Sequence, residues 1–150
     1  MRIVLVNPLI PQNTGSIGRL CAATNTPLTL IEPLGFSLED KYVKRAGLDY
    51  WPWIDVSVTP DWESVLTGGG RPWLFTKTAT RSFYDADYRM GDYLVLGSET
   101  KGLPKAILDR WPGQQVRIPM DNDNVRSLNL AQCTAVAYYE ARRQMRLEGR

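Results

Sequence analysis

The chain has 150 residues, enough for one domain around a single apolar core and too few for a second independent one. Its 43% hydrophobic and 23% charged residues exclude a disordered tail or a fibrous repeat. Eighteen Lys and Arg against sixteen Asp and Glu leave a formal charge of +2, so any contact with nucleic acid must be local. We therefore expect residues 1–150 to form one globular domain.

The first predicted element is a buried strand at 2–7, which alternates β-branched and apolar residues. This apolar run is too short for a signal-peptide core or a membrane helix, so we expect a soluble, cytoplasmic protein with no membrane contact. Asn13 or Thr14 is expected to cap a helix that carries Ile17, Leu20 and Cys21 on one face. A strand at 28–31, a helix at 39–46, a strand at 54–58 and a helix at 61–66 follow.

The second half of the chain continues the alternation of strands and helices. Strands are predicted at 73–76, 92–97 and 115–118, and helices at 104–109 and from Leu128 to about Arg146. This order predicts an α/β fold with a mostly parallel sheet flanked by helices on both faces. Ligands of such sheets bind beyond the carboxyl ends of strands, so we expect the chemistry in the loops after Thr76, Gly97 and Ile118.

The residues available for chemistry are limited, because the chain has no histidine. This excludes Ser-His-Asp hydrolysis and imidazole general bases, and it favours reactions that depend on positioning. The two cysteines, Cys21 and Cys133, both lie in predicted helices and are too few for a zinc cluster or a disulfide framework. We expect buried, unreactive thiols and no metal site.

Three loop-and-helix motifs are candidates for a ligand site. In NTGSIGR (13–19), two glycines allow close approach to a helix, although a capped helix with a solvated Arg19 explains the segment equally well. In GSETKGLP (97–104), two glycines and a proline describe a bend open to a flat ligand, where Glu99 either anchors backbone amides or a basic partner, or is simply exposed. In IPMDNDNVRSLNLAQ (118–132), Ser127 is the expected helix cap, with Asn129 in the first turn.

Together with IEPLGF and KRAGLDYW, these motifs resemble the SPOUT superfamily of RNA methyltransferases, and within it the TrmL-like branch that modifies the wobble nucleotide, a cytidine or modified uridine, of leucine tRNAs. The resemblance covers nearly the whole chain in order. It implies transfer of a methyl group from S-adenosylmethionine to a ribose 2'-hydroxyl of tRNA. It also implies a C-terminal deep trefoil knot and a homodimer with active sites at or near the subunit interface.

The resemblance also assigns roles to residues. It places Arg19 beside the reacting ribose, with Asn13 shaping that site, and it matches Glu99 to the second motif and Ser127 and Asn129 to the third. Because no histidine is present, our hypothesis is that Arg19, held against an RNA phosphate, makes the hydroxyl more acidic or takes its proton. The residues implied for cofactor binding are Lys77, Thr78, Leu96, Gly97, Gly102, Ile118, Met120, Ser127 and Leu128.

Cations near these loops are candidates for RNA phosphate contacts, with ordinary surface charge as the alternative. They are Lys41, Lys44, Arg45, Lys101 and Arg126. The aromatic residues Tyr50, Trp51 and Trp53 could stack on bases, but packing under the sheet or across a dimer is favoured. Two rival functions remain: a related enzyme acting on ribosomal RNA or another tRNA position, and a non-catalytic RNA-binding module.

Overall fold

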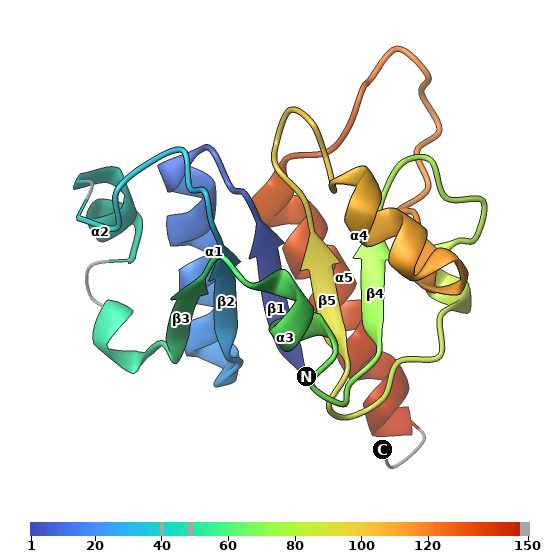
Figure 1. The fold of residues 1–150 in the computed structure, drawn as a ribbon, viewed down its shortest axis with the longest axis horizontal. Helices are drawn as coiled ribbons and strands as arrows, with labels where there is room; N and C mark the ends of the chain where they lie inside the picture. The colour runs from blue at the N-terminus through green and yellow to red at the C-terminus, as the bar shows by residue number, and fades with distance from the viewer. Residues whose placement is uncertain (40, 48–49, 148–150) are drawn as a thin grey trace.

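The computed structural model describes residues 1–39, 41–47 and 50–147, and its centre is one six-stranded sheet (Figure 1). The strand order is β3-β2-β1-β5-β4-β6, and every pairing is parallel, as the sequence predicted. The strands are β1 (Arg2–Val6), β2 (Leu28–Ile31), β3 (Val56–Thr59), β4 (Pro72–Phe75), β5 (Tyr93–Leu96) and β6 (Gln115–Val116).

Helices cover both faces of the sheet. The α-helices are α1 (Pro11–Thr24), α2 (Lys41–Gly47), α3 (Trp62–Leu66), α4 (Lys105–Arg110) and α5 (Leu130–Leu147). Three single 3-10 turns are η1 (Trp51–Trp53), η2 (Phe83–Asp85) and η3 (Pro112–Gln114). The order of elements therefore agrees with the sequence prediction, and the implied trefoil knot stays a prediction.

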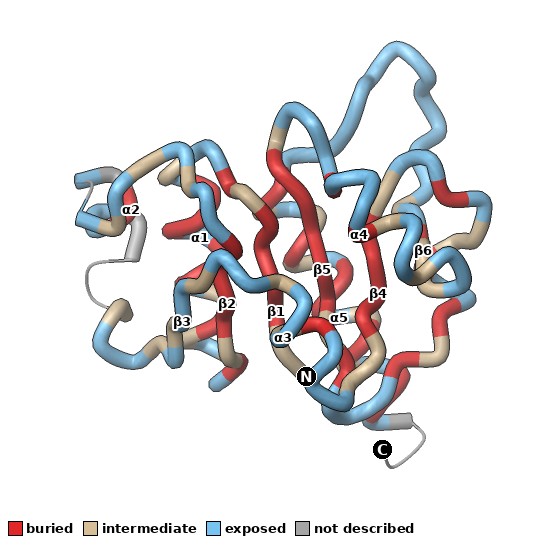
Figure 2. Tube along the Cα trace, in the orientation of Figure 1, coloured by how far each residue is buried: buried red, intermediate tan, exposed pale blue. Residues whose placement is uncertain are grey.

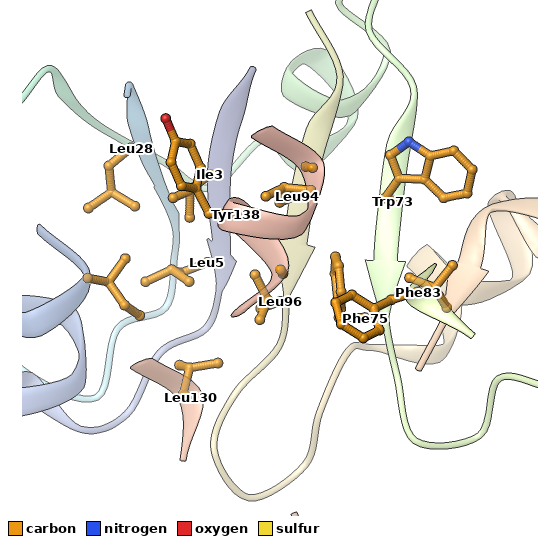
Figure 3. Close-up of a cluster of buried hydrophobic side chains, with 14 of the residues drawn as sticks. Ile3, Leu5, Leu28, Trp73, Phe75, Phe83, Leu94, Leu96, Leu130 and Tyr138 are labelled. Carbon is orange, nitrogen blue, oxygen red and sulfur yellow. The ribbon is translucent and has the colours of Figure 1, made fainter. Parts of the chain in front are cut away.

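The core lies on both faces because side chains of a strand alternate between them. In β1, Ile3 and Leu5 join a buried cluster with residues of α1 and α5, part of which Figure 3 shows. Val4 and Val6 face the other way and pack in a second cluster with residues of α3 and α4. The strands of the sheet centre are buried along their length (Figure 2). Their continuous apolar runs are typical of a parallel sheet covered on both sides.

Of the two thiols expected to be buried, Cys21 is buried and Cys133 is half-buried. Burial raises the pKa of Cys21 to about 12, and burial also raises the pKa of Cys133. Within the described residues, no group of three or more metal-ligating side chains is brought together. None of the helices in that part of the chain is long and apolar enough to cross a membrane.

Several boundaries differ from the sequence prediction, mostly at element ends. The third strand begins at Val56 instead of residue 54, because Trp51–Trp53 forms the turn η1 just before it. The sixth strand ends at Val116 instead of residue 118, although Arg117 still forms an isolated bridge with Ser82. Such ends depend on which neighbouring strand is present to pair with, which local sequence does not reveal.

A buried carboxylate lies at the amino-terminal end of β5, opposite the end of the sheet where the carboxyl ends of the strands meet. Asp92, just before β5, is 3% exposed and accepts hydrogen bonds from the Arg71 guanidinium (2.8 Å), the Trp73 indole (2.9 Å) and the Arg89 backbone amide (2.9 Å). Without the carboxylate, the Trp73 indole and the Arg89 amide would lose their partner, whereas Arg71 would keep its contacts with Asp87. A buried donor without a partner is costly.

We expect Asp92→Ala to lower the free energy of unfolding by about 2 kcal/mol, since Arg71 is partly exposed and can recover some hydration. Urea denaturation measures the change. The activity per folded molecule should stay close to that of the wild type, because Asp92 lies far along the strand from the loops at the carboxyl ends. A stability loss below about 0.5 kcal/mol would contradict this role.

Candidate active site

The loops that follow β1, β5 and β6 lie beyond the carboxyl ends of the strands, at the top of Figure 1. They contain residues 7–10, 97–104 and 117–129. The second of these loops is the motif GSETKGLP and the third holds most of the motif at 118–132, whereas the motif at 13–19 lies within α1, which follows the first loop. Because all strands are parallel, backbone groups and polar side chains from distant parts of the chain lie together at these carboxyl ends.

Glu99 anchors the beginning of α1. Its carboxylate accepts hydrogen bonds from the backbone amides of Leu9 (2.7 Å) and Ile10 (3.0 Å). The prediction that Asn13 or Thr14 caps this helix is wrong, since both are buried inside α1, which begins at Pro11. Pro11 has no amide hydrogen to be satisfied, and a carboxylate from another loop satisfies the amides before it. Of the two readings of Glu99, the structure favours the anchor.

Asn13 connects all three motifs. Its side-chain amide donates to Glu99 Oε1 (3.2 Å), and its Oδ1 accepts from the Asn129 side-chain amide (2.9 Å). The three residues come from α1, the loop after β5 and the segment before α5. We call this chain of bonds the Glu99–Asn13–Asn129 network. It fixes the three segments relative to one another.

Asn129, instead of Ser127, caps α5. Its Oδ1 accepts hydrogen bonds from the backbone amides of Ala131 (2.8 Å) and Gln132 (3.4 Å), so it satisfies two amides at the start of the helix. The predicted cap Ser127 is exposed, three residues before Leu130, where the helix begins. An Asn side chain has a separate acceptor oxygen and donor nitrogen, so it can cap a helix and donate to a distant residue at the same time. A Ser side chain has a single oxygen for both tasks.

The loop after β5 is a tight bend. Ser98 and Gly102 form an antiparallel bridge with bonds of 3.0 and 3.3 Å between their backbones. A Cβ on Gly97 would lie 2.2 Å from the carbonyl carbon of Gly102, so only glycine fits there. Gly102 has φ +67 and open space where a side chain would be. The bend is therefore closely packed on its inner side and open on its outer side.

The residues predicted to bind the cofactor border these loops. Leu96 and Gly97 are buried at the end of β5, while Lys77 and Thr78 are exposed after β4. Two exposed apolar side chains on the segment 117–129 are Met120 (36% exposed) and Leu128 (38%). Of the other residues predicted to bind the cofactor, Ile118 is half-buried, and Gly102 and Ser127 are exposed. Exposed apolar side chains beside an open backbone bend fit a flat, partly apolar ligand such as adenine.

Arg19 is exposed on α1, and its guanidinium lies 4.9 Å from the centre of the Tyr50 ring. Asn13 precedes it by six residues, so the two side chains leave the helix in different directions. Among the described residues, no hydrogen bond or ion pair joins Arg19 to the Glu99–Asn13–Asn129 network. One copy of the chain thus brings together Asn13, Glu99 and Asn129 but not Arg19.

The five cations predicted to contact RNA are all exposed. Arg126 donates to the Thr100 carbonyl oxygen (2.9 Å), which ties the segment before α5 to the bend after β5. Lys44 pairs with Glu39 at the surface. This structural role of Arg126 was missed, because its partner lies 26 residues away. The motif KRAGLDYW includes Leu48 and Asp49, which lie outside the described residues.

Residues 1–139 match the family model described as the SpoU rRNA Methylase family. A protein from Synechocystis sp. is 49% identical over 153 residues, covering 99% of both chains. A Burkholderia cenocepacia protein named tRNA (cytidine(34)-2'-O)-methyltransferase is 47% identical, covering 98% of this chain and 97% of that one.

Solved structures share the fold. One, described as giving structural insights into the 2-OH methylation of C/U34 on tRNA, has a TM-score of 0.89 and 45% identity, covering 99% of this chain and 97% of that chain. The AdoMet-bound rRNA methyltransferase from Sinorhizobium meliloti has a TM-score of 0.84 at 24% identity, covering 96% of this chain but only 56% of that one.

Proposed function

Since this chain belongs to the SpoU methylase family, we propose that it is an enzyme that methylates the ribose 2'-hydroxyl of nucleotide 34 of tRNA, with S-adenosylmethionine as the methyl donor. The observation that carries the proposal is identity of 45–49% along nearly the whole length of relatives whose names or descriptions specify this reaction or this nucleotide.

The bend after β5 and the segment 117–129 fit the methyl donor. The open side of Gly102 and the exposed Met120 and Leu128 offer backbone and apolar surface for an adenosyl group. The donor supplies a methyl carbon on a positively charged sulfur. In the reaction the bond between that carbon and sulfur breaks, its electron pair stays on sulfur, and the carbon bonds to the 2'-oxygen as the hydroxyl proton leaves.

The protein's part in this reaction is positioning and charge. The Glu99–Asn13–Asn129 network holds three segments fixed, so that a bound ribose oxygen could be aimed in line with the methyl carbon, which can supply several kcal/mol. In this proposal the positive charge of Arg19, held against the RNA phosphate, makes the hydroxyl more acidic, and the proton passes to solvent. Arg19 could accept that proton itself only in its neutral form. Glu99, Asn13 and Asn129 act by holding the site together, and Ser127 lies at its exposed side.

The test is direct. The protein is incubated with bulk tRNA and S-adenosylmethionine carrying a labelled methyl group, and the labelled ribose is mapped. We expect the label at nucleotide 34 and, for the finer proposal, in leucine tRNAs. Label confined to ribosomal RNA or to another tRNA position would overturn the assignment. Calorimetry that detected no binding of S-adenosylmethionine would favour a non-catalytic RNA-binding module.

We also propose a cytoplasmic homodimer in which each active site combines the loops of one copy with Arg19 of the other. Among the described residues of one copy, no hydrogen bond or ion pair joins Arg19 to the Glu99–Asn13–Asn129 network, which supports this proposal. The organisation of residues 1–150 as one domain stays a prediction.

The shared site predicts complementation between two inactive variants. Arg19→Ala and Gly97→Ala, each inactive alone, should regain up to about one quarter of wild-type activity after their subunits are mixed and exchanged. Half of the dimers are then mixed, and each mixed dimer has one intact site. The methylation assay measures the gain, and no gain after verified subunit exchange would contradict a shared site.

A further inference from the structure

Trp53 has the most exposed large apolar side chain in the described part of the chain, with 76% of its surface open to solvent. Of the two kinds of packing expected for this side chain, packing under the sheet is therefore wrong, and packing across a dimer stays a prediction. Its neighbours Tyr50 and Trp51 are half-buried. Burying such a ring against a bound partner would be favourable.

The backbone that carries Trp53 is held firmly in place. Trp53 donates its amide to the Tyr50 carbonyl (2.9 Å), and Ile54 donates to the Trp51 carbonyl (3.2 Å). The Trp51 ring packs on α1 so closely that a Cβ on Gly18 would lie 3.1 Å from it. A side chain carried on such a backbone loses less freedom on binding than one on a loose loop, which favours its use as a stacking surface.

This anchoring also places η1 beside Arg19. Gly18, against which Trp51 packs, is the residue before Arg19, and the Arg19 guanidinium lies over the ring of Tyr50. Trp53 therefore belongs to the same local surface as the residue assigned to the reacting ribose.

Cations lie on a second element that packs on α1. Helix α2 packs on α1, as η1 does (Figure 1), and Lys44 and Arg45 in its last turn are exposed. Surfaces that bind single-stranded RNA combine exposed aromatic rings, which stack on bases, with cations, which contact phosphates.

We propose that Trp53 is a stacking platform for an unpaired base of the RNA next to the nucleotide that Arg19 addresses. The proposal rests on the proposed function for the identity of the RNA as tRNA. Stacking does not require methyl transfer, so binding and catalysis can be tested separately.

The test compares the binding of bulk tRNA to the wild type, Trp53→Ala and Trp53→Phe at several salt concentrations, without the methyl donor. We expect Trp53→Ala to weaken binding by roughly 5-fold to 100-fold and Trp53→Phe by much less, because phenylalanine keeps a ring. The slope of log affinity against log salt should not change, because an uncharged ring releases no counterions. In contrast, the double variant Lys44→Ala and Arg45→Ala should lower that slope.

Met90→Ala is the matched control, since Met90 is an apolar residue 68% exposed that lies just before β5, three strands away from β3, which follows Trp53. It should bind tRNA like the wild type. The proposal is overturned if Trp53→Ala binds as tightly as the wild type, or if its weaker binding comes with a lower mass in sedimentation, which would place Trp53 between two copies of the chain. If the wild type fails to methylate nucleotide 34 while Trp53→Ala still weakens binding, the proposed function fails and the platform stands.

Discussion

Replacing Arg19 by alanine is expected to slow methyl transfer to tRNA by about 10²- to 10³-fold or more. The guanidinium is exposed on α1, so its removal costs little packing energy. Its positive charge is what we propose acts on the reacting hydroxyl. With no histidine in the chain, no other side chain is an obvious substitute. Single-turnover rates with labelled S-adenosylmethionine measure the effect, and calorimetry should find the affinity for the donor within about 2-fold of the wild type.

The control for this variant is Arg110→Ala. Arg110 is also exposed on a helix, with its guanidinium 5.8 Å from the centre of the Trp111 ring, so its environment is similar to that of Arg19 over Tyr50. It lies in the last turn of α4 and has no assigned role in the reaction. We expect unchanged turnover. If Arg19→Ala retained more than a tenth of the wild-type rate, Arg19 would not be the catalytic residue.

The elements of the fold could be read from the sequence because their signals are local. The apolar runs of β1, β2 and β5 predict buried strands, and the alternation with helices predicts a parallel sheet. Family resemblance predicted the methyltransferase class, which the match over residues 1–139 confirms. The strand order could not be predicted, because it depends on pairings between strands that are distant in the chain.

The helix caps show why local reasoning fails at the site. Asn13 and Thr14 have the composition of caps, but the carboxylate that anchors α1 comes from Glu99, 89 and 90 positions away from the amides it accepts. In α5, Ser127 is a plausible cap by type, whereas Asn129 caps the helix and also bonds to Asn13, 116 positions away. Both errors have one cause: contacts between distant segments override local preference.

The exposure of Trp53 is a third case. An aromatic cluster near a predicted strand is more often buried than exposed, so the sequence favoured packing. Only the structure shows that Trp51 makes the contact with α1, while Trp53 in the same turn points away from the core. Two tryptophans in one short turn can thus differ, one packed on a helix and one exposed, and amino-acid composition does not show which is which.

Replacing Gly97 by alanine is expected to abolish binding of the methyl donor and lower kcat/KM by about 10²-fold or more. A Cβ there would lie 2.2 Å from the Gly102 carbonyl carbon and 2.3 Å from the Leu103 amide nitrogen, both backbone atoms that cannot turn aside. The bridge between Ser98 and Gly102 must therefore open, which moves Glu99 within that loop and disturbs the network that holds α1 and α5. The same overlap should lower the free energy of unfolding by about 1–3 kcal/mol.

Gly113→Ala is the matched control, because nothing lies within 4 Å of a Cβ at that position. It should bind the donor like the wild type and unfold at a similar urea concentration. Calorimetry and urea denaturation of both variants separate loss of the site from loss of the fold. A folded Gly97→Ala protein that bound the donor with wild-type affinity would show that the bend after β5 does not form the donor site, since no alanine fits there without displacing the backbone on which that site depends.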